Sequence, residues 1–264
     1  MKKILITGAN SYIGTSFEKY LAQWPDRYRV DTVDMIDGSW REKSFAGYDV
    51  VFHVAGIAHM KETKENSHLY YEVNRDLAVQ TAEKAKADGV SQFIFLSTMA
   101  VYGIDEGVID RNTKPNPKSH YGKAKLEAEQ RMKLLAGEDF AIAVLRPPMV
   151  YGDGCKGNYQ SLVKFAKVMP VFPDYPNKRS MLHIDGLCAY VKNVIDRSAD
   201  GLFLPQDEAY VCTCHMVQQI AENMGRKLPL WKVLNPIVSL AKAYTRMGKK
   251  AFGDLYYEQE PRQP

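Results

Sequence analysis

Cysteine is scarce in this chain of 264 residues, and long apolar runs and a strong excess of either charge are missing. Its four cysteines show no disulfide framework, which argues against a small domain held together by disulfides. No stretch of about 18 apolar residues and no cleavable leader pattern occurs, so we expect a cytoplasmic protein without an integral membrane segment. The net charge of +4 is dispersed, and no basic run interleaves with aromatic residues, which argues against a nucleic-acid partner.

The composition fits one large core with a smaller appended part, since 45% of the residues are hydrophobic and 25% are charged. Short apolar runs that are typical of strands alternate with segments of helical periodicity. The predicted strands are residues 1–7, 28–33, 49–54, 92–97 and 140–145, and the main helices are residues 12–23, 69–87 and 120–135. This alternation predicts an α/β fold of Rossmann type, a doubly wound parallel sheet with helices on both faces.

The pattern changes near Pro147, beyond which glycines and aromatic residues become more frequent and the elements become shorter. Helices are predicted at residues 159–168 and 186–197, and a third begins at Thr213, whose hydroxyl suits an N-cap. This part of the chain is expected to form a smaller lobe.

A last apolar helix is predicted at residues 236–244, followed by Arg246, Lys249 and Lys250. We interpret it as a helix of the lobe or its core. The basic residues behind it leave a contact with a membrane surface as the alternative.

The segment TGANSYIG at residues 7–14 follows the first predicted strand and opens a helix. In that context a glycine-bearing turn offers backbone N–H groups and a helix N-terminus to a pyrophosphate. Gly8 permits the tight turn and Gly14 the close packing of the helix, whereas Ser11 stands where a third glycine is typical. A purely structural turn is the alternative interpretation.

Asp34 ends the second predicted strand, 26 residues after Gly8. A carboxylate there can accept hydrogen bonds from an adenosine ribose and repel a 2′-phosphate, which favours NAD over NADP. Arg41 lies close enough in sequence to weaken this preference, and a solvated acid at a strand end is the alternative. Only 19 residues separate Asp34 from His53, so a shortened connection replaces the usual helix and strand.

Tyr121 and Lys125 are four residues apart in a predicted helix, so the phenol and the ammonium lie on one helix face. An ordinary phenol has a pKa near 10, and a neighbouring cation can lower it where water is excluded. The pair is therefore a candidate acid/base device. A surface tyrosine packed along a lysine stem is the alternative.

The segment Cys212-Thr213-Cys214-His215 has the residue types of a metal site. No second ligand pair follows at the spacing of zinc sites, so we predict no metal and interpret the segment as a buried strand end and a helix start.

These motifs occur in one order along the chain: Gly8, Gly14, Asp34, HVAG at residues 53–56, Asn74, STMAVYG at residues 97–103, and Tyr121 with Lys125. In this order they resemble an extended short-chain dehydrogenase/reductase of the NAD-dependent sugar epimerase/dehydratase family. The segments LRPPMVYG, GNY and RSMLHID, at residues 145–152, 157–159 and 179–185, look like parts of that family's substrate lobe. With Ala58-His59, the RPPMVYG segment is most similar to bacterial nucleotide-sugar 4-epimerases and 4-keto reductases.

The resemblance implies that Tyr121 accepts and donates the proton, while Lys125 binds the nicotinamide ribose and lowers the phenol pKa. Thr98 would hydrogen-bond the reacting sugar oxygen, as general acid/base chemistry requires. Asn158 and Arg179 match positions that hold the nucleotide diphosphate of the substrate, although either side chain could simply be exposed.

The resemblance also implies two domains: a dinucleotide-binding Rossmann domain over residues 1–150, to which segments from 180–212 return, and a mainly substrate-binding lobe over residues 151–264. Asn74 supports the site on a central helix, with plain packing as its alternative role. The residues assigned to NAD are Gly8, Asn10, Ser11, Tyr12, Ile13, Gly14, Asp34, Val54, Ala55, Gly56, Asn74, Ser97, Tyr121 and Lys125.

The expected reaction is epimerisation of a nucleotide sugar, such as C4 epimerisation of a UDP-hexose through a 4-keto intermediate. A 4-keto reductase would use the same residues once and is the alternative. A dehydratase is disfavoured because Met99 and Ala100 stand where such enzymes carry an Asp-Glu pair. A regulatory protein that senses the dinucleotide without turnover is the alternative from another class. The helices at residues 69–87 and 120–135 often form a dimer contact in this family, so a homodimer is considered.

Overall fold

The computed structural model describes residues 1–58 and 60–259, and it divides into two compact units. The first unit comprises residues 1–103, 115–148 and 183–205, and the second comprises residues 104–114, 149–182 and those from Gln206 onward. His59, which contributes to the resemblance noted above, and residues 260–264 lie outside the described residues.

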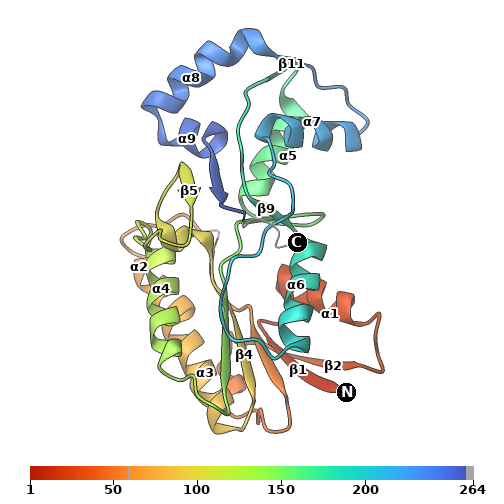
Figure 1. Ribbon diagram of the computed structural model, residues 1–264, viewed down its shortest axis with the longest axis vertical. Coiled ribbons are helices and arrows are strands. Elements are labelled where there is room, and N and C mark those ends of the chain that lie inside the picture. Colours follow the sequence, from red (N-terminus) through yellow and green to blue (C-terminus); the bar gives the residue numbers. More distant parts are fainter. Residues whose placement is uncertain (59, 260–264) are drawn as a thin grey trace. The chain divides into compact units, whose positions relative to one another are not determined.

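A six-stranded parallel sheet forms the centre of the first unit, in the order β10-β6-β4-β3-β1-β2 (Figure 1). All five predicted strands are present, and the expected doubly wound parallel α/β fold is confirmed. A sixth strand comes from the returning segment near residue 200. The bounds are β1 (Lys2–Thr7), β2 (Tyr28–Val33), β3 (Val50–His53), β4 (Gln92–Leu96), β6 (Ala141–Leu145) and β10 (Gly201–Phe203).

Helices cover both faces of this sheet (Figure 1). One face carries α1 (Tyr12–Leu21) and α6 (Ile184–Asp196), where the rings of Phe17 and Phe52 meet edge to face at 5.2 Å. The other face carries the continuous helical run of α2 (Ser67–Tyr71), the π-helical segment η2 (Glu72–Leu77) and α3 (Ala78–Ala87), together with α4 (His120–Lys133). Apolar side chains of α3, α4 and alternate strand positions fill a core there, because strand side chains point to the two faces in turn.

The strand register brings the predicted site residues to one edge. Thr7 pairs with Val33 and with His53, and His53 pairs with Phe95, so the carboxyl ends of β1, β2, β3 and β4 are aligned. The chain leaves β1 for β2 on one side and continues from β3 on the other. That reversal is the switch point at which open parallel sheets bind ligands.

The predicted short connection between β2 and β3 is confirmed. It holds only the 3-10 turn η1 (Ser39–Arg41), whose Trp40 is buried at 2% exposure. The apolar indole anchors a segment that would otherwise be too short to cover the sheet edge by itself.

The second unit has its own core between α5 (Asn158–Val168) and α7 (Thr213–Asn223). The C-terminal part of the unit contains α8 (Asn235–Tyr244) and α9 (Arg246–Phe252), preceded by the 3-10 turn η4 (Lys232–Leu234). Its short parallel pairs are β5 (Gly107–Ile109) with β12 (Leu255–Tyr257) and β8 (Phe172–Pro173) with β11 (Leu230–Trp231), while β7 (Met149–Tyr151) joins β9 (Met181–His183).

Two details of the second unit differ from expectation. Cys212, not Thr213, occupies the N-cap position of α7, because the Thr213 hydroxyl is used in the interior, where it donates to the Ala251 carbonyl at 2.9 Å. Helix α8 lies in the second unit, as the interpretation as a lobe helix expected, but it is not a core helix, because Val238 is its single buried residue. Among the described residues, no helix is both long and apolar enough to cross a bilayer.

Candidate active site

The turn after β1 has no room for side chains at its two glycines. Gly8 has a φ of +97°, and a Cβ added there would lie 2.9 Å from the backbone nitrogen of Ala55. A Cβ on Gly14 would lie 2.7 Å from the Ser11 Oγ and 3.3 Å from the Val54 side chain. The glycines therefore allow the ends of β1 and β3 to approach at the switch point, as a dinucleotide-binding turn requires.

Ser11 is the N-cap of α1, and its hydroxyl accepts a hydrogen bond from the Gly14 N–H at 3.1 Å. This cap explains why a serine stands in place of the third glycine. Asn10 takes a φ of 65°, and Tyr12 and Ile13 begin the helix, whose first-turn N–H groups have no intrahelical acceptor. A turn of this geometry fits the pyrophosphate of a dinucleotide.

Asp34 follows β2 at the same edge and is exposed, with one carboxylate oxygen accepting from the Ile36 N–H at 2.8 Å. The Gly8 and Ala9 N–H groups both donate to the Val33 carbonyl, which holds the turn beside Asp34. Arg41 faces elsewhere: its guanidinium stacks 4.7 Å from the Trp40 ring and donates to Gln80. The arrangement suits a ribose with a free 2′-hydroxyl, and thus NAD.

Asn74 lies in the π-helical segment and is fully buried. Its amide accepts from the Ile57 N–H at 3.1 Å and donates to the Ile57 carbonyl at 2.9 Å. A Cβ on Gly56 would lie 2.6 Å from the Asn74 Oδ1 and 3.5 Å from the Lys125 Nζ. Asn74 therefore positions the loop after β3, and the three residues converge at the sheet edge.

The Tyr121 phenol is hydrogen-bonded to the Thr98 hydroxyl, which joins two members of the predicted triad. Thr98 is also the N-cap of the 3-10 turn η3 (Met99–Tyr102), where it accepts from the Ala100 N–H at 3.1 Å. Burial raises the pKa of Tyr121 to about 12, the Thr98 hydrogen bond opposes this rise, and Tyr70 adds to it. The Tyr70 ring lies edge to face with Tyr121 at 6.4 Å.

Lys125 is 4% exposed, and its Nζ donates to the Leu96 carbonyl at 2.9 Å and lies 4.5 Å from the Phe95 ring. Burial lowers the pKa of Lys125 to about 7, and the charge of Glu129 partly opposes that shift. The causes of the Tyr121 shift are burial, Thr98 and Tyr70, and the lowering of its pKa by Lys125 stays a prediction. Burial is the largest cause of the raised Tyr121 pKa, because it penalises the charged phenolate.

A buried charge network that the sequence did not reveal lies one turn beyond Lys125. Glu129 on α4 accepts from the Ser97 hydroxyl and from the Arg146 guanidinium, whose Nε lies 3.1 Å away. Arg146 also donates to the Tyr102 hydroxyl at 3.0 Å. Ser97 therefore bonds to the protein interior, and Arg146 belongs to the first unit.

Glu62 is a second contributor that sequence reasoning missed. Its carboxylate accepts from the N–H groups of His120 at 3.1 Å and Tyr121 at 3.0 Å. An anion at this position satisfies two unpaired donors and complements the positive end of the α4 dipole. The sequence near α4 shows only its N-cap, Ser119. It does not reveal Glu62 as a partner of this helix, because Glu62 lies almost 60 residues earlier in the chain.

The two residues predicted to hold the substrate, Asn158 and Arg179, both belong to the second unit. Asn158 is exposed at the first position of α5. The Arg179 guanidinium donates to the Gly253 carbonyl at 3.0 Å, and burial lowers its pKa from the usual range. Their roles toward a substrate remain predictions.

The Cys212, Cys214 and His215 ligand atoms all lie within 4.8 Å of one another, and the two Sγ atoms are 3.0 Å apart. The hydrogen bond between the two thiols lowers the pKa of Cys212, although burial opposes this, and raises the pKa of Cys214, where burial adds to the rise. Three ligands fall short of the four that structural zinc takes, and the absence of a metal stays a prediction.

Comparison with known proteins agrees with this geometry. Residues 4–201 match the model of the NAD dependent epimerase/dehydratase family. The chain is 31% identical over 264 aligned positions to a UDP-glucose 4-epimerase of Vibrio cholerae, covering 89% of this chain and 79% of the relative. It is 24% identical to an N-acetyl-α-D-glucosaminyl-diphospho-ditrans,octacis-undecaprenol 4-epimerase of Escherichia coli O157:H7, covering 89% of this chain and 76% of the relative.

Solved structures show the same fold. A UDP-glucuronic acid 4-epimerase of Bacillus cereus in complex with NAD superposes with a TM-score of 0.72 at 20% identity, covering 97% of this chain and 89% of that one. A dTDP-4-dehydrorhamnose reductase of Clostridium acetobutylicum gives a TM-score of 0.69 at 25% identity, covering 87% and 82%. With its glycine turn, acid after β2 and Thr98–Tyr121 pair, the chain belongs to the NAD-dependent epimerase/dehydratase family of enzymes.

Proposed function

We propose that this enzyme is a 4-epimerase of a hexose carried on a diphosphate, with a UDP-hexose as the first candidate substrate. The observation that carries the proposal is the hydrogen bond between Tyr121 and Thr98, one helical turn from Lys125 at the sheet edge where the cofactor turn ends. The 31% identity to a UDP-glucose 4-epimerase supports the reaction type.

In this proposal Tyr121 and Thr98 take the proton of the sugar 4-hydroxyl through their shared hydrogen bond, while the hydrogen on carbon 4 leaves as a hydride. When bound, NAD supplies the hydride acceptor for this step. Return of the hydride to the opposite face of the 4-keto sugar gives the epimer, and Tyr121 gives back the proton. Lys125 holds the nicotinamide ribose, and Asn158 with Arg179 are the proposed diphosphate contacts.

The direct test incubates the purified enzyme with NAD and a panel of UDP-hexoses, and follows isomers by chromatography and NADH by absorbance. We expect interconversion of C4 epimers with little net NADH, because the hydride returns to the sugar. Failure to bind NAD together with failure to turn over any sugar would contradict the proposal. NAD binding without turnover of any sugar, together with a biological activity that Tyr121→Phe leaves unchanged, would instead support a regulatory role.

The runner-up is a 4-keto reductase, which the likeness to a dTDP-4-dehydrorhamnose reductase at 25% identity supports. A reductase uses the hydride once, so it consumes one reduced cofactor for each 4-keto sugar. Stoichiometric loss of NADH absorbance with a 4-keto sugar, and no isomerisation of the parent UDP-hexose, would favour it over the epimerase.

A hexose joined through diphosphate to a lipid, in place of UDP, is a second candidate substrate. The Escherichia coli O157:H7 relative is named for a sugar joined through diphosphate to undecaprenol. Helix α8 of this chain exposes several large apolar side chains, which suits work beside a lipid-linked substrate. The substrate panel therefore includes an N-acetylhexosamine diphosphate linked to a polyprenol in detergent.

The homodimer also remains a proposal. The helical run of residues 67–87 and α4 lie together on one face of the sheet, as a helical dimer contact would need. Sedimentation equilibrium measures the oligomeric state. A purely monomeric enzyme with full activity would contradict the proposed homodimer.

A further inference from the structure

Although Lys and Arg are dispersed along the chain, the net positive charge comes from one segment of the second unit. Residues 223–253, called here the basic segment, contain seven Lys and Arg and no Asp or Glu. The other residues contain 28 basic against 31 acidic side chains, so without the basic segment the chain would be slightly acidic. A segment of one sign this long is expected to recognise a partner of the opposite sign.

The same segment exposes large apolar side chains. Six of them fall within residues 231–247, a concentration that the rest of the described chain does not match. On α8, Ile237, Leu240 and Tyr244 are 67%, 61% and 82% exposed and share one helix face at i, i+3 and i+7. The others are Trp231, Val233 and Met247. Single exposed apolar residues are ordinary, but an apolar face of this kind marks an interaction surface.

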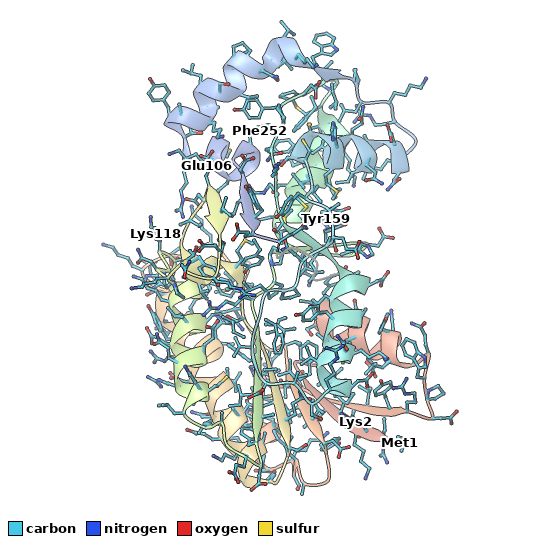
Figure 2. All side chains as sticks on the ribbon, in the orientation of Figure 1. Met1, Lys2, Glu106, Lys118, Tyr159 and Phe252 are labelled. Atoms are coloured by element: carbon cyan, nitrogen blue, oxygen red, sulfur yellow. The ribbon has the colours of Figure 1, made fainter. Side chains whose placement is uncertain are left out.

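The hairpin of α8 and α9 is held in a defined shape. A Cβ on Gly248 would lie 2.4 Å from the Ala241 carbonyl carbon, so glycine lets α9 pack directly on α8. Lys242 pairs with Glu106 at 2.5 Å and Arg246 with Asp105 at 2.7 Å, which tie the hairpin to the turn before β5. Glu106 and Phe252, both labelled in Figure 2, mark this junction. The apolar face is thus presented by a fixed element.

Acidic neighbours offset only part of the charge. Asp105 also lies 3.8 Å from Lys250, and Asp174 lies 4.0 Å from Lys232. Among the described residues, Asp105, Glu106 and Asp174 pair with four of the seven basic residues, and Asp254 adds to the rise in the pKa of Lys242 that Glu106 causes. The side chains of Lys227 and Lys249 are also exposed.

The basic residues and the exposed apolar face of α8 together favour one kind of binding partner. A second copy of the chain would bring the same cations against these cations, which opposes self-association. A nucleic acid would satisfy the cations but would leave the isoleucine and leucine side chains in water. An anionic bilayer satisfies both, because apolar side chains enter the acyl boundary while Lys and Arg meet the headgroups and Trp and Tyr occupy the interface.

We infer that α8 and α9, with the preceding Trp231 and Val233, form an interfacial anchor that lays its apolar face on a bilayer rich in anionic lipids. The helices lie on the surface and do not cross the membrane. This inference stands apart from the proposed reaction, since it concerns binding of the protein to lipid and not turnover.

The test is co-sedimentation of the full chain with vesicles of phosphatidylcholine alone and of phosphatidylcholine with about one third phosphatidylglycerol. The wild-type chain is expected in the pellet with anionic vesicles and in the supernatant with neutral ones, and high salt should release a large part of it. Replacing Ile237, Leu240 and Tyr244 together by serine should weaken vesicle binding by about tenfold or more.

The matched control replaces Leu134, Val168 and Leu202 by serine, since these are 84%, 62% and 51% exposed at other places. It should bind vesicles like the wild type. NAD affinity and circular dichroism of each variant check that the fold is intact. A wild-type chain that stays in the supernatant with anionic vesicles would refute the inference, as would equal loss of binding by the two variants. A concentration-dependent dimer that only the α8 variant abolishes, without vesicle binding, would assign the face to a protein contact instead.

Discussion

The side chains at the candidate site hold unusual charge states because they are buried together. Burial raises the pKa of Tyr121 to about 12 and lowers that of Lys125 to about 7, so at neutral pH the phenol is protonated. Burial causes both shifts, since it penalises phenolate and ammonium alike. A proton acceptor in this resting state needs an added positive charge nearby, which oxidised NAD would bring.

Replacing Tyr121 by Phe is expected to lower turnover by about 10²- to 10⁴-fold, because the proton of the sugar hydroxyl loses its acceptor. NAD affinity should change little. Steady-state kinetics with a UDP-hexose and titration of NAD by calorimetry measure the two effects. Tyr20→Phe, on a helix of the opposite face, is the control and should keep full activity. An unchanged kcat in Tyr121→Phe would count against the assigned role.

Lys125→Met is expected to stabilise the protein without cofactor at pH 7 while it lowers NAD affinity and turnover. The pKa of Lys125 is lowered on folding, so the unfolded chain binds more protons between about pH 7 and the usual lysine pKa, and stability rises with pH across that window. Below about pH 7 the penalty is complete, on the order of 1.4 kcal/mol for each unit of pKa. Chemical denaturation at pH 6, 8 and 10 measures the slope.

The control for that experiment is Lys123→Met, because Lys123 is exposed on the same helix. It should leave the pH dependence of stability unchanged. Equal slopes for Lys125→Met and the wild type would mean that Lys125 is not the group responsible.

At the scale of elements, tight approach of backbones shapes the site. Gly8→Ala should reduce NAD affinity and lower the free energy of unfolding. A positive φ alone costs an alanine roughly 1–2 kcal/mol, and we expect a larger loss here because the added Cβ would collide with the Ala55 backbone. Gly47→Ala is the matched control: it has a φ of +83° but open space around it. Calorimetric NAD titration and urea denaturation of both variants separate strain from collision. Equal effects at the two positions would show that contact with the Ala55 backbone is not the cause of the loss at Gly8.

The buried network links α4 to the ends of β4 and β6, so it is expected to matter for stability. Glu129→Ala leaves Arg146 buried without its carboxylate and should cost about 3–5 kcal/mol of unfolding free energy. Arg131 lies on the same helix as Glu129, and Arg131→Ala breaks an exposed pair with Asp76 of the π-helical segment, so it should cost less than about 1 kcal/mol. Urea denaturation compares them. A small loss in Glu129→Ala would show that water replaces the missing carboxylate.

At the scale of the whole molecule, NAD should stabilise the folded enzyme. With NAD at about a hundred times its dissociation constant, the gain is about 2.7 kcal/mol, or a rise in Tm of about 5 °C. NADP at the same concentration should give a much smaller rise, because its 2′-phosphate would face Asp34. Differential scanning fluorimetry measures both, and an equal rise with NADP would contradict the preference for NAD.

Local patterns in the sequence were sufficient for much of the fold. Strand runs, helix periodicity and the turn at residues 7–14 depend on neighbours a few positions apart, and β2 was found at its observed bounds. The i, i+4 placement of Tyr121 and Lys125 follows from helix geometry alone. The family resemblance rests on the same local motifs and is confirmed by the match over residues 4–201.

Only the tertiary structure decided the pKa shifts at the site and the side chains that hold the site residues in place. The sign of the Tyr121 shift, the Glu62 cap, the Glu129–Arg146 pair and the exposed face of α8 all depend on what lies around a residue in space. Desolvation sums over neighbours that are far apart in the chain, and periodicity shows that a helix has an apolar face but not what covers it. The sequence thus determined which groups are present, and the packing determined their charge and their surroundings.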